Sequence, residues 1–470
     1  MSQTGDLPKS DPFAAETTGL VEKFSNVPWL PQRIGFWFYQ TIGMESLIVA
    51  HSMLAVIACG VMMATIVLRG VPAWGGVAGG LIMYLISFPA IGILRPQLLG
   101  LVGLSLVLLA SGQILRRLHP LCWLPVVMGL WANCHASCIL GLGVLALGVV
   151  SDAIDCWWNT GRAAKRCSDK VVRRRLWLFL LCTLAACLNP LGTNLLLRAV
   201  PLWIGPALVD IPARRPLDLV SLSGILFFTS LLITAFVIRH SRRRFRPVDV
   251  LLLTVFGVLA LTSPRMLGWW GIVWPWMLLP HACSIWWPSG NAEDDSVEDD
   301  SADGQLGRSA VRTLFAMACV FATLRWAPAS QALISNDHRG LAKITASDTP
   351  LYVAHEIQRR GWEGTFFCPL DWSDYLMWTT QGAVKPLAYS HVHLARADTL
   401  RDQLRISQGD PEWLRIAETY DLDYLVICRR RNDALRRLVE YHPRTDIVYQ
   451  DDIVYQDEQG LVVRLLPRGA

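Results

Sequence analysis

Charged residues are scarce in this chain of 470 residues, because Asp, Glu, Lys and Arg together make up only 17% of it, whereas hydrophobic residues make up 53%. Soluble globular domains carry about 25% charged residues. Apolar runs close to the roughly 20 residues that an α-helix needs to cross a bilayer recur along the chain. The composition therefore excludes an ordinary soluble protein and predicts a polytopic α-helical membrane protein.

The motifs of several enzyme classes are also missing. The sequence has no Gly-rich phosphate loop followed by Lys and Ser or Thr, no Gly-x-Gly-x-x-Gly after a strand, and no Ser or Cys nucleophile motif. Its 12 Cys never form a Cys-x-x-Cys unit, so neither a zinc site nor a disulfide framework is indicated. We expect no cofactor, and no motif indicates a divalent metal.

Basic residues gather beside the apolar runs. They account for most of the net charge of +5, and clusters of this kind are typical of cytoplasmic membrane flanks. We therefore expect membrane lipids, and not nucleic acid, as partners.

The apolar runs define a multi-pass domain. Spans are expected at 46–68, 73–94, 97–115, 121–150, 176–203, 219–238, 248–262, 266–287 and 310–328. The run at 121–150 has no acidic or basic side chain except His135, and it needs a topology of its own.

Charge predicts that topology. Five Arg lie in 239–246 and seven Lys and Arg in 151–175, and Arg116 and Arg117 precede the run, so all three flanks should be cytoplasmic. A single crossing would put the two flanks of 121–150 on opposite sides. We therefore prefer a hairpin of two short or re-entrant limbs that turns between Asn133 and Ser137, with a single crossing as the alternative. Counting the hairpin as two gives about ten passes.

Three domains are expected from this count. Residues 1–45 form an external polar segment that ends in an interfacial helix at 29–43, where Trp and Tyr suit the membrane surface. Residues 46–328 form the multi-pass transmembrane domain. Residues 329–470 have an ordinary soluble composition in which helical and strand-like patterns alternate, so we expect a small extracytoplasmic α/β domain.

Two cations are expected at the outer face. Arg95-Pro96-Gln97 separates two spans, and Arg265 comes after Ser263-Pro264. A guanidinium can pair bidentately with phosphate oxygens. The alternative for Arg95 is a side chain that reaches the lipid headgroups while the proline starts a helix.

Three polar residues lie within apolar surroundings. Asn133 and His135 could contact a substrate or transfer a proton, or they could satisfy backbone groups at the turn. Asn189, before Pro190, is expected to break one helix and to cap the next segment of the chain.

The C-terminal domain holds two further polar pairs. Asp371 and Asp374 lie three apart at an expected helix start, where capping is the simpler explanation and a metal pair the alternative. His391 and His393 would project to one face of a strand, but no third ligand is evident.

Short motifs occur in an order that resembles bacterial polytopic proteins related to the GT-C glycosyltransferase superfamily. They are Arg95-Pro96-Gln97-Leu98, Leu130-Trp131-Ala132-Asn133 followed by His135, Leu188-Asn189-Pro190-Leu191-Gly192, Asp371-Trp372-Ser373-Asp374-Tyr375-Leu376, Gly409-Asp410-Pro411-Glu412-Trp413 and Tyr420-Asp421-Leu422-Asp423-Tyr424-Leu425-Val426. Their shared order extends over nearly the whole chain.

The resemblance implies a membrane glycosyltransferase that takes a sugar from a polyprenyl-phosphate-linked donor at the outer face of a bacterial inner membrane and passes it to an unidentified acceptor. Asp11 would be the catalytic carboxylate. The residues that would bind the lipid phosphate or line a vestibule are Arg95, Gln97, Asn133, His135, Asn189 and Arg265.

The sequence also departs from the family pattern. The segment from Gly5 to Phe13 resembles the second half of the family's first external loop, so we expect the preceding helix and acidic residue either upstream of Met1 or lost. Ala136-Ser137 stands where relatives carry glycines, and Ser373 replaces a glycine of the family motif in the C-terminal domain. The alternative function is therefore a non-catalytic scaffold, binding or export component with an extracytoplasmic recognition domain. A solute transporter is less consistent, because the two halves show no inverted repeat.

Overall fold

The computed structural model describes two compact units, one up to residue 335 and one from residue 340 onward. The described residues are 28–92, 94–113, 120–158, 169–197, 217–286, 328–335, 340–346, 348–390, 395–440, 442, 445–450 and 460–465. Asp11, His391, His393 and nearly all of the span expected at 310–328 lie outside them.

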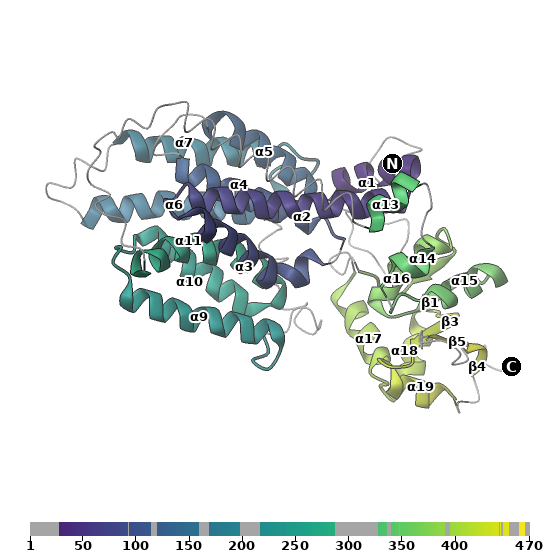
Figure 1. The fold of residues 1–470 in the computed structure, drawn as a ribbon. Coiled ribbons are helices and arrows are strands. Elements are labelled where there is room, and N and C mark those ends of the chain that lie inside the picture. Colours follow the sequence, from purple (N-terminus) through teal and green to yellow (C-terminus); the bar gives the residue numbers. More distant parts are fainter. Residues whose placement is uncertain are drawn as a thin grey trace. The chain divides into compact units, whose positions relative to one another are not determined.

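The first unit is helical (Figure 1). Its elements are α1 (Trp29–Ile42), α2 (Met44–Val67), α3 (Ala73–Ile91), α4 (Gln97–Gln113), α5 (Pro120–Cys134), α6 (Cys138–Trp158), α7 (Asp169–Ala186), α9 (Leu222–His240), α10 (Pro247–Thr262), the 3-10 turn η5 (Pro264–Met266), α11 (Leu267–Trp286) and α13 (Pro328–Ser335). Within the described residues, three segments are long and apolar enough to cross a membrane: Met44–Val67, Cys138–Asp155 and Leu222–His240. The prediction of a mostly helical chain with membrane-length apolar helices is confirmed.

The helices alternate in direction, so their ends gather at two levels. Late in α3, Ser87 Oγ donates to the Gly268 carbonyl at the start of α11 over 2.9 Å. Gly100 in α4 lies against Ser137, since a Cβ on it would be 2.5 Å from Ser137 Oγ. The described segments at this end, which we call the Arg95 end, are 91–92, 94–100, 133–138, 187–193 and 262–268.

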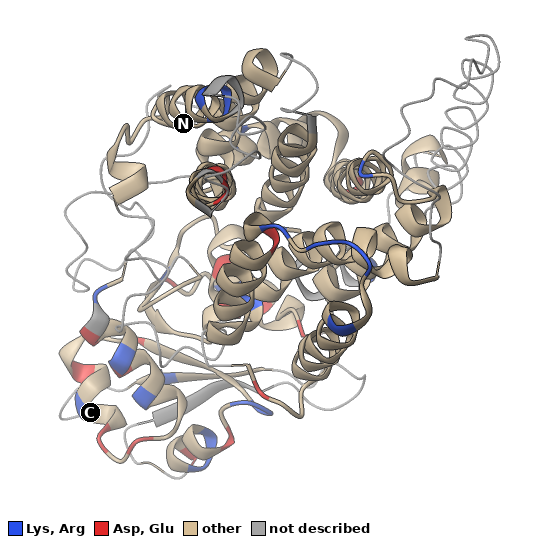
Figure 2. Cartoon of the chain, turned by 90° about the vertical axis from the view of Figure 1, so that its left-hand side faces the viewer, with Lys and Arg blue, Asp and Glu red and all other residues tan. Residues whose placement is uncertain are grey.

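The opposite end is rich in arginine. There Arg175 Nη1, near the start of α7, donates to the Gly148 carbonyl of α6 over 2.9 Å, and Ser241 after α9 contacts His281 late in α11. The segments at this Arg69 end are 67–73, 147–152, 173–176, 239–249 and 276–284. Figure 2 views the helical unit from this side, where blue residues lie at helix ends and along a connecting loop.

The run at 121–150 reverses where the hairpin is predicted. Helix α5 ends at Cys134, α6 begins at Cys138, and both pack against α7. Asn133 lies beside the C-terminal end of α7 and Gly148 beside its N-terminal part, so α5 and α6 run in opposite directions. The prediction of two short limbs is wrong for the second, because α6 has 21 residues. Its sequence contains no proline that could end it earlier.

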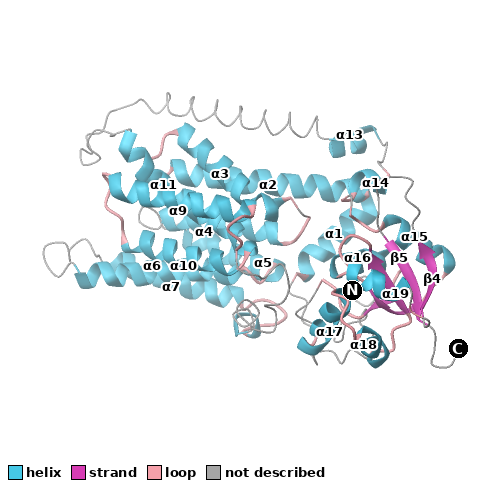
Figure 3. Cartoon of the chain, turned by 90° about the horizontal axis from the view of Figure 1, so that it is seen from below, coloured by secondary structure: helices cyan, strands magenta, loops and turns pink. Residues whose placement is uncertain are grey.

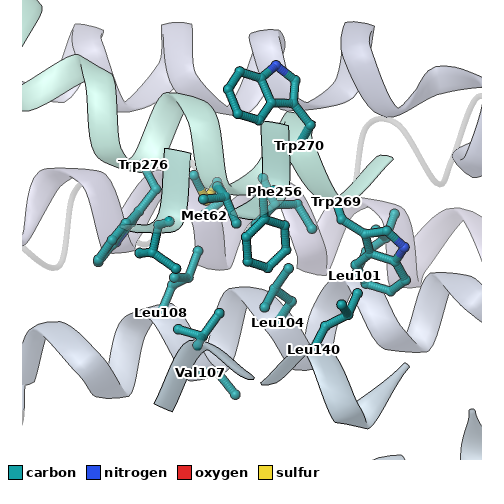
Figure 4. Packing of buried hydrophobic residues seen from close by; sticks show 14 of the residues in the cluster. Met62, Leu101, Leu104, Val107, Leu108, Leu140, Phe256, Trp269, Trp270 and Trp276 are labelled. Atoms are coloured by element: carbon teal, nitrogen blue, oxygen red, sulfur yellow. The ribbon is translucent and has the colours of Figure 1, made fainter. Parts of the chain in front are cut away.

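Helix α11 is the core of the unit. Most of its residues are buried, and it contacts α2, α3, α4, α9 and α10. A helix that is hydrophobic on all sides is typical of such a position. Figure 4 shows Trp269, Trp270 and Trp276 among residues from α2, α4, α6 and α10. Two indoles find hydroxyl partners on α9, since Trp270 Nε1 donates to Ser230 Oγ and Trp274 Nε1 to Thr234 Oγ1, each over 2.8 Å.

The outer faces of the surrounding helices are apolar as well. Leu81 and Leu85 on α3, Leu184 on α7 and Leu232 on α9 are all more than one-third exposed. Apolar surface on this scale would be unfavourable in water and is expected where lipid covers it. Helix α1 has no buried residue and exposes Trp37, as expected for a helix at a membrane surface.

The second unit combines a five-stranded sheet with helices (Figure 3). Its elements are α14 (Leu341–Ile344), α15 (Leu351–Arg360), β1 (Gly364–Phe367), α16 (Leu370–Thr379), β2 (Val384–Pro386), α17 (Ala397–Ser407), α18 (Trp413–Thr419), β3 (Tyr424–Cys428), α19 (Asp433–Glu440), β4 (Thr445–Gln450) and β5 (Gly460–Leu465). The order is β2-β1-β3-β5-β4, with β1 parallel to β2 and β3 and with β5 antiparallel to β3 and β4. Every residue of β3 is buried, as expected of a central strand covered on both faces.

The capping explanation for Asp371 is wrong. The residue before α16 is Pro369, and no side chain caps the helix. Asp371 instead pairs with Arg431 in the turn after β3, because the parallel neighbours β1 and β3 bring their carboxyl ends together.

Candidate functional site

The α5–α6 turn is built by its own side chains. His135 N–H still donates to the Trp131 carbonyl, but Ser137 N–H, two residues later, bonds to His135 Nδ1 over 3.1 Å. A side chain that takes a backbone donor in this way competes with the helix. The helix therefore stops, and α6 starts again one residue after Ser137.

A buried hydrogen bond between Trp131 and Ser137 stabilises the turn. Trp131 Nε1 donates to Ser137 Oγ over 3.1 Å, and both residues are buried. The indole fits only because neighbouring positions lack side chains: a Cβ on Gly103 or on Gly141 would lie 2.6 Å from a ring atom of Trp131. The glycines of α4 and α6 thus allow close packing around this tryptophan.

Asn133 joins three segments. Its Oδ1 accepts from Trp29 Nε1 of α1 over 2.9 Å, and its Nδ2 donates to the carbonyls of Gly129 and Leu188, each over 2.8 Å. The Leu188 carbonyl lies just after α7, where helix-end carbonyls need partners from outside the helix. Both N–H groups of Asn133 are therefore used in holding α1, α5 and α7 together.

Asn189 is used locally. Its Nδ2 donates to the Ala186 carbonyl over 2.6 Å, and its Oδ1 accepts from Leu191 N–H over 2.7 Å. Its amide thus closes the end of α7 and shapes the turn after it, so its structural explanation is the one that the geometry favours.

Two cations and an amide lie at the same end of the helical unit as this turn. Arg95 is exposed between α3 and α4, and no hydrogen bond or ion pair of its guanidinium is found among the described residues. Gln97 is the half-buried first residue of α4, three positions before Gly100. Arg265 is exposed in η5, four residues before Trp269, which also lies against Gly100.

The six predicted binding residues that the structure describes therefore lie at the Arg95 end. They come from the α3–α4 link, the α5–α6 turn, the segment after α7 and η5. The predicted catalytic carboxylate, Asp11, lies outside the described residues. Of the predicted binding residues, Gln97 and His135 are potential hydrogen-bond donors and Arg95 and Arg265 carry positive charge, which is a chemistry suited to an anion, whereas the amides of Asn133 and Asn189 are used within the protein.

Sequence reasoning missed several residues here. Ser137 and Trp131 could have been suspected from their position around His135, whereas Trp29 lies 104 positions from Asn133 and no local pattern connects them. Glu45, in the first turn of α2, is a buried carboxylate in a place where a helix N-terminus favours negative charge.

A second polar cluster lies at the Arg69 end. Pro280 has no N–H, so the Trp276 carbonyl one turn earlier lacks its helical partner. Arg69 supplies one: its Nη1 donates to this carbonyl over 2.6 Å, and its Nη2 lies 3.4 Å from the buried carboxylate of Asp249. His281 Nε2 is 3.7 Å from the other oxygen of Asp249. This cluster fastens α2, α10 and α11 to one another.

Metal ligands are not gathered in the described part of the chain. Within it, no group of three or more His, Cys, Asp or Glu side chains is placed to hold a metal ion.

Comparison with known proteins adds no assignment. No protein-family model matches the chain, and no curated protein matches it either. A function must therefore be inferred from the geometry of the chain's own residues.

Proposed function

We propose that this chain is a GT-C-like membrane glycosyltransferase that binds a polyprenyl-phosphate-linked sugar donor at its Arg95 end. One observation carries the proposal: residues from four separate segments, singled out for their polarity within apolar surroundings, lie at the same end of the helical unit. That end is opposite the arginine-rich flanks.

The charge pattern supports the orientation. Short cytoplasmic loops are enriched in Lys and Arg, and the Arg69 end holds Arg173, Arg174 and the arginines of 239–246. The Arg95 end would then be the outer end. Helix α13 packs on α2 and lies at the same end of the helical unit as α1 in Figures 1 and 3, so the chain would enter the second unit on the outer side. The membrane would be a bacterial inner membrane that the chain crosses about ten times.

The proposed roles correspond to the chemistry of sugar transfer. The departing lipid phosphate gains negative charge in the transition state, and a guanidinium close to its oxygens stabilises that charge. Arg95 and Arg265 would supply it. A carboxylate must take the acceptor's proton, and Asp11 is the residue proposed for this step.

Sugar transfer can be tested directly. The full-length protein in nanodiscs would be incubated with radiolabelled polyprenyl-phosphate sugars and a membrane extract containing acceptors. Transfer is expected for at least one donor, and Arg95→Ala should reduce it about 100-fold or more, as expected for loss of one transition-state donor. Arg244→Ala, which changes an exposed arginine at the opposite end, is the matched control and should retain activity. Absence of transfer with every donor, or full activity of Arg95→Ala, would refute the proposal.

The second candidate is a non-catalytic scaffold or binding component. Asn133 and Asn189 favour it, because their amide N–H groups are already bonded within the protein. It predicts that the protein binds a polyprenyl phosphate or an envelope component without any turnover.

A further inference from the structure

The hydrogen bonds around His135 determine where its ring carries a proton. Its Nδ1 accepts the backbone N–H of Ser137 over 3.1 Å, and a nitrogen that accepts a hydrogen bond has no proton of its own. The ring is therefore neutral, with its proton on Nε2.

Ser137 reinforces this tautomer. Its Oγ lies 2.7 Å from the same Nδ1 and also accepts the Trp131 indole N–H over 3.1 Å. Because Nδ1 accepts the Ser137 N–H and so has no proton, the hydroxyl must be the donor to Nδ1, while its oxygen accepts the indole N–H. Ser137 is completely buried and lies against Gly100, so it has no room to turn away.

The Nε2–H group of His135 is left as the ring's free donor. No partner for Nε2 is found among the described residues, and the ring is only partly buried in the turn between α5 and α6. A neutral donor of fixed direction suits an acceptor oxygen. The exposed Arg95 and the N-terminus of α4 at the same end favour an oxygen that carries negative charge.

We infer that His135 is a neutral hydrogen-bond donor, fixed in its tautomer by Ser137, that binds a phosphate oxygen of a lipid-linked donor through Nε2–H. The identity of the ligand rests on the proposed function, whereas the tautomer does not. His135 is then a binding residue and not the general base, because its one unprotonated nitrogen already accepts two donors. Ser137 is its positioning residue.

Nitrogen NMR of the full-length protein, labelled with [15N]histidine in nanodiscs, tests both parts. His135→Phe identifies the His135 signals among those of the 10 histidines by their loss. Between pH 6 and 8 we expect an unprotonated Nδ1 and a protonated Nε2. Undecaprenyl phosphate added to the nanodisc should shift the Nε2–H signal, and undecaprenol, which lacks the phosphate, should not.

Two serine variants test the positioning role. Ser137→Ala removes the hydroxyl that bonds to Nδ1 but keeps the backbone N–H, so the proton should stay on Nε2 while the Nδ1 signal shifts. The less firmly held ring should raise the Kd for undecaprenyl phosphate about 5-fold, as for one lost hydrogen bond. Ser105→Ala is the matched control, because Ser105 is equally buried but bonds only within α4, to the Leu101 carbonyl. It should leave both the Nδ1 signal and the Kd unchanged.

The outcomes separate the two proposals. A proton on Nδ1, an equal response to undecaprenol, or equal effects of the two serine variants would overturn the inference even if sugar transfer is found. A phosphate-specific Nε2 shift without any transfer would support the inference and refute the enzyme.

Discussion

Replacing Arg69 by Leu should be among the most destabilising changes at the Arg69 end. The substitution removes the partner of the Trp276 carbonyl, and a buried polar group without a partner costs about 1–3 kcal/mol. It also leaves the Asp249 carboxylate, which is 1% exposed, without its arginine, and breaking a buried ion pair costs about 3–5 kcal/mol. Because the two costs share one side chain, we expect a total of about 3–5 kcal/mol.

A double-mutant cycle with Pro280→Ala isolates the carbonyl contribution. Alanine at position 280 restores a backbone N–H one turn after Trp276, so the carbonyl regains a helical partner without Arg69. Arg69→Leu should then cost about 1–3 kcal/mol less than it does in the original chain.

The assay is reversible unfolding in micelles, monitored by circular dichroism across a denaturant series. Arg244→Leu, an exposed arginine at the same end, serves as control and should stay within about 0.5 kcal/mol. Equal costs of Arg69→Leu with and without Pro280 would refute the carbonyl explanation. A cost below about 1 kcal/mol would refute the whole account of a buried pair.

Three further predictions concern the other parts of the chain. Gly103→Ala should destabilise the helical unit by about 1–3 kcal/mol because its Cβ would clash with Trp131, whereas Gly112→Ala on the same helix, with open space around it, should be neutral or slightly stabilising in the same unfolding assay. Asn133→Leu removes the acceptor of the Trp29 indole and should release α1, which limited proteolysis would detect as new cleavage near Trp29. Unchanged cleavage would show that Asn133 does not hold α1 in place. In the second unit, the hydrogen bond from Arg359 and the neighbouring Arg360 lower the pKa of Glu356 to about 2. The ionised Glu356 carboxylate therefore stabilises the fold fully above the unfolded pKa of about 4.3, and this stabilisation is lost as the pH falls through 2. Glu356→Gln should therefore lower the unfolding midpoint at pH 7 by a small amount and have no effect near pH 2, and a difference that persists there would contradict the assignment.

The sequence predicted features that depend on charge and on local pattern. The reversal between Asn133 and Ser137 was predicted from basic flanks on both sides of one apolar run, and the gathering of Arg95, His135 and Arg265 at one end from counting alternate passes. Both predictions need only the order of the apolar segments and the enrichment of Lys and Arg in cytoplasmic loops.

Features that depend on partners distant in the sequence could not be predicted. Asn133 looked equally suited to a substrate and to a turn, and only the positions of Trp29 and Leu188 show that its amide clamps helices together. Nothing local in the sequence connects Arg69 with Trp276, 207 positions away. An all-round apolar pattern also failed to mark α11 as the core, because lipid-facing helices share that pattern.

The two indole–hydroxyl bonds between α11 and α9 have a mechanical consequence. Trp270 and Trp274 are four residues apart, as are Ser230 and Thr234, so the two hydrogen bonds are spaced by about one helical turn. A partial axial displacement of α11 would break both bonds at once. A displacement of one full turn, about 5.4 Å, could bring Trp270 level with Thr234 and keep one bond. The free energy of sliding α11 along α9 should therefore not vary smoothly with the displacement. It should have minima one helical turn apart, because of these two hydrogen bonds.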